Sequence, residues 1–165
     1  MSNAAVAPQP ASGITGPVLL VVAGGAVSQA AIARTAELAA GAPVTVVGIE
    51  TSEISRTDAA SRRPAHPTRP AGAAPQPEQV RRTVALAMSV LEDTGVMAMG
   101  HIVTGSPARA VARMARAGGT RVVIIDQEGR GAGAGGLMAE LRRRMYGSGI
   151  VVLAETDRRG GWVSV

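Results

Sequence analysis

The chain of 165 residues is long enough for one domain, and its net charge of +5 at pH 7 comes from 17 basic side chains, all of them arginine. It contains no cysteine, which excludes disulfides, thiol nucleophiles and thiolate metal sites. No apolar run approaches the roughly 20 residues that cross a bilayer, and the first residues lack the charged-then-apolar order of a signal peptide. We therefore expect a cytoplasmic protein without a membrane partner. Because only His66 and His101 supply imidazoles, we expect no metal site either.

The arginines raise the question of a nucleic-acid partner. Such binding needs positive charge gathered on one face, and single strands or RNA usually add stacking aromatic side chains. Here the arginines are spread along the chain, and Tyr146 and Trp162 are the only aromatic residues. We interpret the arginines as a solvated surface and expect no nucleic-acid partner.

The first third of the chain predicts a strand, a helix and a second strand. Residues 1–16 are rich in alanine, proline, serine and glycine without an apolar period, which is typical of a disordered tail. Residues 18–22 are continuously apolar, as in a strand that is buried on both faces. Ser28 can cap a helix over 29–40, and 44–49 is again mostly apolar. These elements predict a βαβ unit.

Four prolines, several alanines and scattered charges fill residues 51–76. This segment lacks a core pattern and predicts an insertion within a single domain over 17–155; whether it docks a partner stays open. Pro77 then begins a helix that extends to residue 94, and 96–103 predicts a third strand.

The last third continues the alternation. Ser106 is expected to cap a third helix, which two glycines end, and 122–125 is a fourth apolar strand. A short helix over 137–145 and a fifth strand over 150–154 follow, and 156–165 is expected to be a second tail. The regular order of strands and helices predicts an α/β fold, a doubly wound, five-stranded, mainly parallel sheet.

One segment in this order resembles a known family. Residues 105–111 read Gly-Ser-Pro-Ala-Arg-Ala-Val and precede a helix and a buried strand. This resembles the universal stress protein family, which has Gly-x-Pro-Ala-x-x-Ile, a helix and a buried strand at this place. The first strand and helix and the last strand also resemble the family. The resemblance implies a Rossmann-like fold of the adenine-nucleotide hydrolase type.

The resemblance also implies where a nucleotide would bind. Many members of the family bind ATP through Gly-x2-Gly-x9-Gly-Ser/Thr after the fourth strand and through an Asp after the first. Carried over, Asp126 stands at the first glycine, Gly129 at the second, Ala139 and Glu140 at the closing pair, and Ala23 at the first-strand Asp. The other positions of the implied site are Val21, Ile49, Ile125 and Gly131.

These substitutions predict that ATP binding is lost or weakened. Replacing glycine by Asp126 adds a side chain and a negative charge where backbone N–H groups should meet phosphate. Ala23 removes a carboxylate that would accept a hydrogen bond from the ligand. We expect Glu140 near the amino end of the last helix, where it would compete with phosphate. No cofactor is therefore expected.

Two other interpretations of this region are weighed. Residues 131–136 contain Gly-x-Gly-x-x-Gly between a strand and a helix, but the dinucleotide fingerprint opens the first βα unit, so we favour a flexible loop. An adenine nucleotide or smaller anion held through Gly129 to Gly136 stays open as an alternative. The carboxylates Glu50, Asp126, Glu128 and Glu140 could hold Mg²⁺ or Ca²⁺, but we expect them to pair with arginines instead.

The chain offers no nucleophile with a base and an orienting group, so we expect that it is not an enzyme. The last strand is apolar and is expected to be an exposed sheet edge that joins a homodimer, as is common in the family. Its residues are Ile150, Val151, Val152 and Leu153. The sequence thus predicts a non-catalytic, universal-stress-protein-like domain that acts through protein association or regulation.

Overall fold

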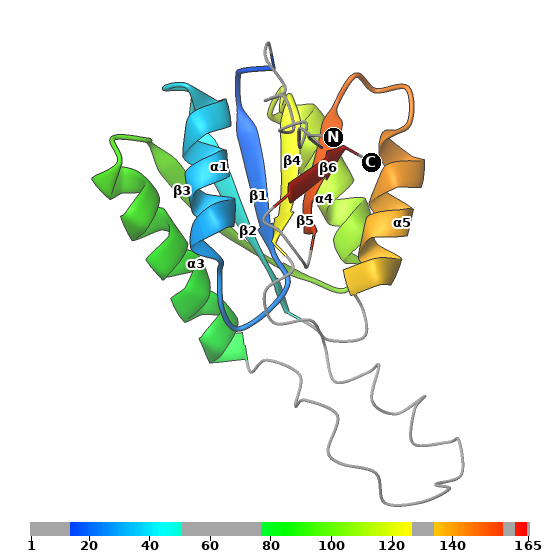
Figure 1. The fold of residues 1–165 in the computed structure, drawn as a ribbon. Helices are drawn as coiled ribbons and strands as arrows, with labels where there is room; N and C mark the ends of the chain where they lie inside the picture. The colour runs from blue at the N-terminus through cyan, green and yellow to red at the C-terminus, as the bar shows by residue number, and fades with distance from the viewer. Residues whose placement is uncertain (1–13, 51–76, 127–133, 157–160, 165) are drawn as a thin grey trace, which may run out of the picture.

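One sheet runs through the computed structural model, which describes residues 14–50, 77–126, 134–156 and 161–164 (Figure 1). The strand order is β3-β2-β1-β4-β5-β6. The strands are β1 (Val18–Val22), β2 (Val44–Glu50), β3 (Ala98–Thr104), β4 (Val122–Asp126), β5 (Val151–Thr156) and β6 (Gly161–Ser164). The first five are parallel to their neighbours, and β6 is antiparallel to β5. The predicted doubly wound, five-stranded parallel sheet is confirmed, with β6 added at its edge.

Helices cover both faces of this sheet (Figure 1). They are α1 (Gln29–Ala39), α3 (Pro77–Asp93), α4 (Pro107–Ala117) and α5 (Ala134–Met145). The central strands β1 and β4 are buried at every position, which explains why their sequences are apolar without alternation. Strands and helices were therefore placed well by the sequence pattern.

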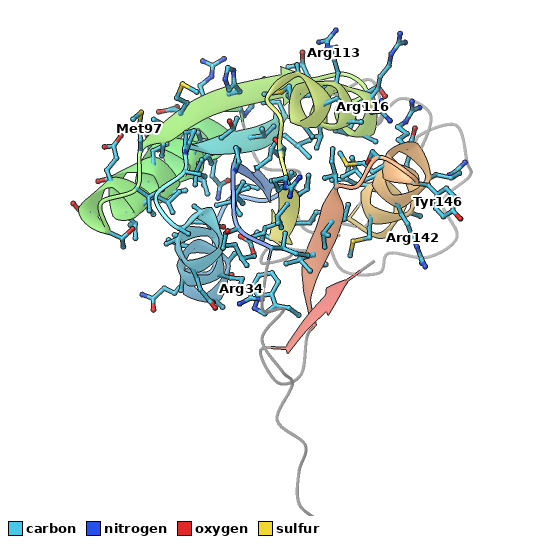
Figure 2. The ribbon with its side chains drawn as sticks, turned by 90° about the horizontal axis from the view of Figure 1, so that it is seen from above. Arg34, Met97, Arg113, Arg116, Arg142 and Tyr146 are labelled. Carbon is cyan, nitrogen blue, oxygen red and sulfur yellow. The ribbon has the colours of Figure 1, made fainter. Side chains whose placement is uncertain are left out.

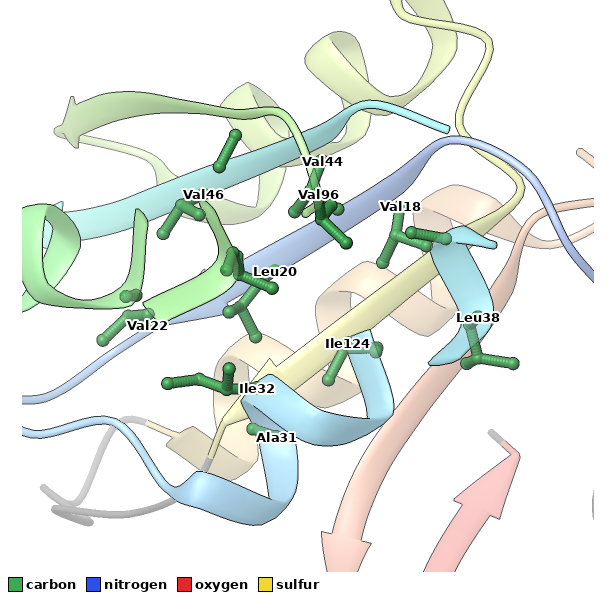
Figure 3. Close-up of a cluster of buried hydrophobic side chains, with 14 of the residues drawn as sticks. Val18, Leu20, Val22, Ala31, Ile32, Leu38, Val44, Val46, Val96 and Ile124 are labelled. Atoms are coloured by element: carbon green, nitrogen blue, oxygen red, sulfur yellow. The ribbon is translucent and has the colours of Figure 1, made fainter. Parts of the chain in front are cut away.

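Two hydrophobic clusters follow from this arrangement, one on each face. Figure 3 shows the first, in which Leu20, Ile124 and Val46 meet Ile32 and Leu38 of α1. The second lies between the sheet and the helices α4 and α5 and includes alternate residues of the same strands. The parity of each strand position therefore decides which pair of helices its side chain meets.

Two boundary expectations and one expected capping bond are wrong. Ile14 packs against the first cluster and the Gly16 N–H donates to the Leu38 carbonyl, so the domain begins before residue 17. Part of the expected tail over 156–165 forms β6, and Trp162 packs against the first cluster. Ser106 stands at the N-cap of α4, but its side chain makes no capping hydrogen bond. The rest of the expected first tail and the insertion over 51–76 lie outside the described residues.

Gly48 lets α3 lie close to β2. A Cβ at this position would lie 2.6 Å from Val84 Cγ2 and 2.7 Å from Val80 Cγ1. Gly48→Ala is therefore expected to lower the free energy of unfolding by about 1–3 kcal/mol through overpacking. The matched control is Gly136→Ala in α5, where nothing lies within 4 Å and the helix should gain about 1 kcal/mol. Urea unfolding of both variants measures the difference, and equal effects would contradict the close packing of α3.

Candidate functional site

The sheet order places a topological switch point between β1 and β4. From β1 the chain proceeds to β2 on one side, and β4 lies on the other. In open α/β sheets, ligands bind at the carboxyl ends of the strands that flank this point. Val22 and Asp126 are partners in register there, at the last positions of β1 and β4. The residues around this pair are therefore the candidate site.

Asp126 holds the amino end of α1. Its side chain is 1% exposed, and its Oδ2 accepts a hydrogen bond of 3.0 Å from the Ser28 backbone N–H. Ser28 is the N-cap of α1, and its Oγ accepts from the Ala31 N–H, also at 3.0 Å. In a capping box, an acidic side chain three residues after the cap accepts from the N-cap N–H. That position is Ala31 here, and the carboxylate comes from β4 instead.

The loop that connects β1 to α1 is also held by α3. Thr83 donates its hydroxyl hydrogen to the Gly25 carbonyl at 2.9 Å. The side-chain amide of Gln79 lies directly over Gly25, where a Cβ would come within 2.5 Å of Gln79 Cδ. The loop is therefore bonded to α3 at Gly25 and to β4 at Ser28. This loop borders the switch point. Side chains of the protein itself therefore hold the loop at two positions, Gly25 and Ser28.

The other predicted site residues of the strands are apolar and buried. Val21, Ile49 and Ile125 are 0%, 4% and 0% exposed, and all three belong to the cluster under α4 and α5. Ala23 follows β1 and packs partly against the same cluster. The structure thus brings Val21, Ala23, Ile49, Ile125 and Asp126 to neighbouring strand ends, with Asp126 as the polar group among them.

Glu140 does not take the place that was expected for it. Helix α5 begins at Ala134, so Ala139 and Glu140 lie in its second turn rather than at its amino end. Glu140 accepts two hydrogen bonds from Arg144, at 2.9 Å from Nε and 2.6 Å from Nη2. The expected position of Glu140 near the amino end of the helix is wrong, because α5 begins earlier than the sequence pattern predicted. Gly129 and Gly131 lie outside the described residues.

Two of the four carboxylates, Glu50 and Glu140, pair with arginines as expected, whereas Asp126 accepts a hydrogen bond from the Ser28 N–H. Glu50 at the end of β2 lies 3.4 Å from the Nε of Arg81, and Glu140 pairs with Arg144. Within the ranges that the structure describes, no three acidic or histidine side chains are close enough to hold a metal ion. Glu128 lies outside these ranges.

Strand β5, which the sequence predicted to be the last strand and an exposed edge, is paired with β6 over part of its length. Strand β6 pairs with β5 from Leu153 to Thr156. Val152 and Leu153 are 1% and 5% exposed and belong to the two clusters, while Val151 and Ile150 pack partly against them. The expected interface at Ile150 to Leu153 is therefore part of this chain's own core and sheet. The sequence pattern missed this because the β6 segment has only four residues, too few to show an alternating pattern.

Several arginines lie on the outer sides of α4 and α5. Figure 2 shows Arg113 and Arg116 on α4 and Arg142 on α5, away from Arg34 of α1. The two helices pack side by side, and Arg113 and Arg142 point away from them in different directions. In the described part of the chain, no helix is both long and apolar enough to span a bilayer.

Two contributors to the site were missed by sequence reasoning. Gln79 and Thr83 were not singled out, although Thr83 occupies a core position in the stripe formed by Val80, Val84 and Ala87. A buried threonine in such a stripe is a signal, because its hydroxyl needs a partner. Here that hydroxyl meets both the Gln79 and the Gly25 carbonyls.

Asp126→Ala should lower the free energy of unfolding by about 2 kcal/mol, because the Ser28 N–H loses a charged acceptor at a helix amino end. Asp126→Asn keeps an acceptor and should cost about half as much. The control is Glu78→Ala in α3, which removes a pair with Arg82 in which both side chains are exposed and should cost under about 1 kcal/mol. Chemical unfolding tests the order; equal losses for the alanine variants would refute the capping role.

The fold can be compared with known proteins. No protein-family model matches the chain, and no curated protein does. Among solved structures, a universal stress protein family member from Burkholderia pseudomallei is similar, with a TM-score of 0.54 and 20% identity over 88% of this chain and 98% of that chain. A universal stress protein from Archaeoglobus fulgidus has a TM-score of 0.54 and 17% identity over 86% and 93% of the two chains.

A universal stress protein from Archaeoglobus fulgidus in complex with dAMP is similar as well. Its TM-score is 0.52, with 18% identity over 86% of this chain and 98% of that chain. At these identities the likeness concerns the backbone. The resemblance seen in the sequence is thus confirmed at the level of structure: this chain has the fold of the universal stress proteins.

Proposed function

We propose that this chain is a non-catalytic, universal-stress-protein-like domain of the cytoplasm that acts by protein association or regulation, with a lost or weakened ATP site. The observation that carries the proposal is the Asp126 carboxylate. It is buried at the switch point and bonded to the amino end of α1. A nucleotide phosphate would have to approach this negative charge at the edge of the sheet where open α/β folds bind ligands.

The size of this effect follows from Coulomb's law. A carboxylate about 4 Å from a phosphate charge costs about 1 kcal/mol in water-like surroundings and about 4 kcal/mol at an effective dielectric of 20. That range corresponds to roughly a fivefold to a thousandfold loss of affinity. The side chains of Gln79 and Thr83 also hold the adjacent loop, so an incoming ligand would have to displace contacts that stabilise the domain.

Four hydroxyl groups of the described residues make hydrogen bonds with the backbone, which is consistent with a non-catalytic role. Ser28 accepts from a helix N–H, and Thr35, Thr83 and Ser148 donate to backbone carbonyls of nearby helical residues. These bonds stabilise helix ends and turns. A nucleophilic hydroxyl needs a neighbouring base to remove its proton, and these hydroxyls are committed to the backbone instead.

A partner of acidic character suits the surface best. Arg109, Arg113 and Arg116 of α4 and Arg142 and Arg143 of α5 are all exposed, and the two helices are neighbours. Arg116 additionally bonds the Arg144 carbonyl, which joins the helices. A surface of this charge attracts acidic protein segments through long-range electrostatics. We include a second copy of the chain among the partners, as a homodimer.

A second candidate function is an adenine-nucleotide- or anion-binding regulator that uses the loop from Gly129 to Gly136. The dAMP complex of the similar Archaeoglobus protein favours it, because that protein has the same fold and binds its ligand. The two candidates differ in one measurable property, the affinity for nucleotide.

Isothermal titration calorimetry of the unmodified protein with ATP should give no measurable binding below millimolar concentration. Asp126→Asn should bind ATP at least about fivefold more tightly than the unmodified protein, since it removes the charge and keeps the shape. Glu140→Gln is the matched control, because Glu140 pairs with Arg144 in the second turn of α5, and it should leave the affinity unchanged. A micromolar dissociation constant for the unmodified protein would establish the nucleotide-binding regulator instead.

A further inference from the structure

Strand β3 is an open sheet edge of unusual composition. In the described part of the chain it pairs with β2 alone. It is seven residues long and lacks proline, lysine, arginine and acidic residues, the features by which natural edge strands discourage pairing. Met97, directly before the strand, is 70% exposed, and Met99 and Ile102 within it are 52% and 36% exposed. Figure 2 shows Met97 at this end of the sheet, far from β6.

Helix α3 carries a self-complementary stripe beside this edge. Arg81, Ala85, Met88 and Glu92 follow each other at intervals of four, three and four residues, so they share one helix face. Met88 marks the position of this face, because its Sδ would lie 2.5 Å from a Cβ on Gly100 of β3. The stripe is complementary to a second, antiparallel copy of itself. Glu92 of one helix would lie against Arg81 of the other, and Met88 against Ala85.

The carboxyl end of α3 carries charges that an isolated helix disfavours. Glu78 in the first turn suits the helix dipole, but Glu92 and Asp93 end the helix, and its last turn has no basic residue. Acidic residues at a helix carboxyl end are unfavourable with the helix dipole, and Arg81 lies on the same face nearer the amino end. A neighbouring antiparallel helix reverses this, because each acidic end then meets a basic one. Local rules broken in this way are a signal of function.

We propose that two copies of this chain pair through their β3 edges, antiparallel, about a two-fold axis that passes through Gly100. The two sheets then form one continuous sheet, with the two α3 helices side by side on the same face. This inference deepens the self-association part of the proposed function and does not depend on the state of the nucleotide site.

The geometry of strand and helix agrees on this axis. Gly100 lies opposite Val84 and Met88, whose midpoint in sequence is within one residue of the midpoint of the Arg81-to-Glu92 stripe. A single axis can therefore serve both elements. Helix α3 packs against both β2 and β3, so two α3 helices would be two strand spacings apart, about 10 Å. That is the usual distance between packed helices.

The opposite edge of the sheet is less suited to this role. There β6 covers β5 from Leu153 to Thr156, and the apolar side chains of β5 lie in the subunit's own core. The β3 edge instead presents backbone donors and acceptors together with exposed apolar side chains. Antiparallel pairing of two β3 strands would satisfy the backbone groups and cover the apolar side chains in one contact. Residues on either side of the axis, such as Met99 and the other copy's His101, would face each other.

The test is the mass in solution by sedimentation equilibrium. The unmodified chain should behave as a dimer of twice 16.6 kDa. Glu92→Arg places an arginine against Arg81 of the other copy, twice per dimer, and should raise the dimer dissociation constant at least about tenfold. Because an arginine suits the last turn of a helix, this variant should keep or raise the melting temperature, so that lost dimer cannot be ascribed to unfolding.

Asp93→Arg is the matched control. It makes the same charge change in the same helix turn, but about 100° around the helix from the stripe, and it should leave the dimer intact. Glu92→Arg combined with Arg81→Glu should recover dimer relative to Glu92→Arg alone, despite some repulsion between the carboxylate introduced at position 81 and Glu50. Met99→Lys puts a charge on the edge itself and should weaken the dimer independently. A monomeric unmodified chain, equal masses for the Glu92 and Asp93 variants, or no recovery in the double variant would each overturn the proposal.

Discussion

The hydrogen bond between Asp126 and the Ser28 N–H determines how the carboxyl edge of this sheet is built. It fixes the end of β4 to the start of α1, and through α1 it fixes the loop that follows β1. Helix amino ends attract negative charge because their first N–H groups lack partners within the helix. In this fold, that attraction is satisfied from within by a carboxylate that is 1% exposed. At the edge where other proteins of this architecture bind a ligand, a carboxylate of this chain therefore fixes β4 to α1.

Two edges of the molecule consequently have different chemistry. The carboxyl edge is internally bonded: Asp126, Gln79 and Thr83 hold its first loop. Within the described residues, the lateral edge at β3 has a strand paired on one side only, exposed methionines and a helix whose carboxyl end carries acidic residues against its own dipole. The proposed association concerns the lateral edge at β3, whereas the proposed loss of nucleotide binding concerns the carboxyl edge. The two properties are physically independent, because they lie at the end and at the side of the sheet.

Much of this fold follows from local sequence, and the site follows only in part. The apolar runs of β1 and β4 predicted buried parallel strands, and Ser28 predicted its helix start, because burial and capping are read within a few residues. The importance of Asp126 was inferred from a family pattern, but its partner was not, since Ser28 is 98 residues away. Glu140 was misplaced because glycines at 135 and 136 entered the helix, and β6 was missed because four residues are too few to show a strand pattern.

The parallel pairing of β1 with β4 also bears on the order in which the chain can fold. Val18 to Val22 match Val122 to Asp126 in register, so the central strand gains its second neighbour and α1 its final cap only after most of the chain exists. A nascent chain that ends before β4 lacks both. The cost of closing this long loop grows only with the logarithm of its length, so added residues between β2 and α3 penalise folding little. The native pairing of β1 with β4 therefore cannot form before the fourth strand has been synthesised.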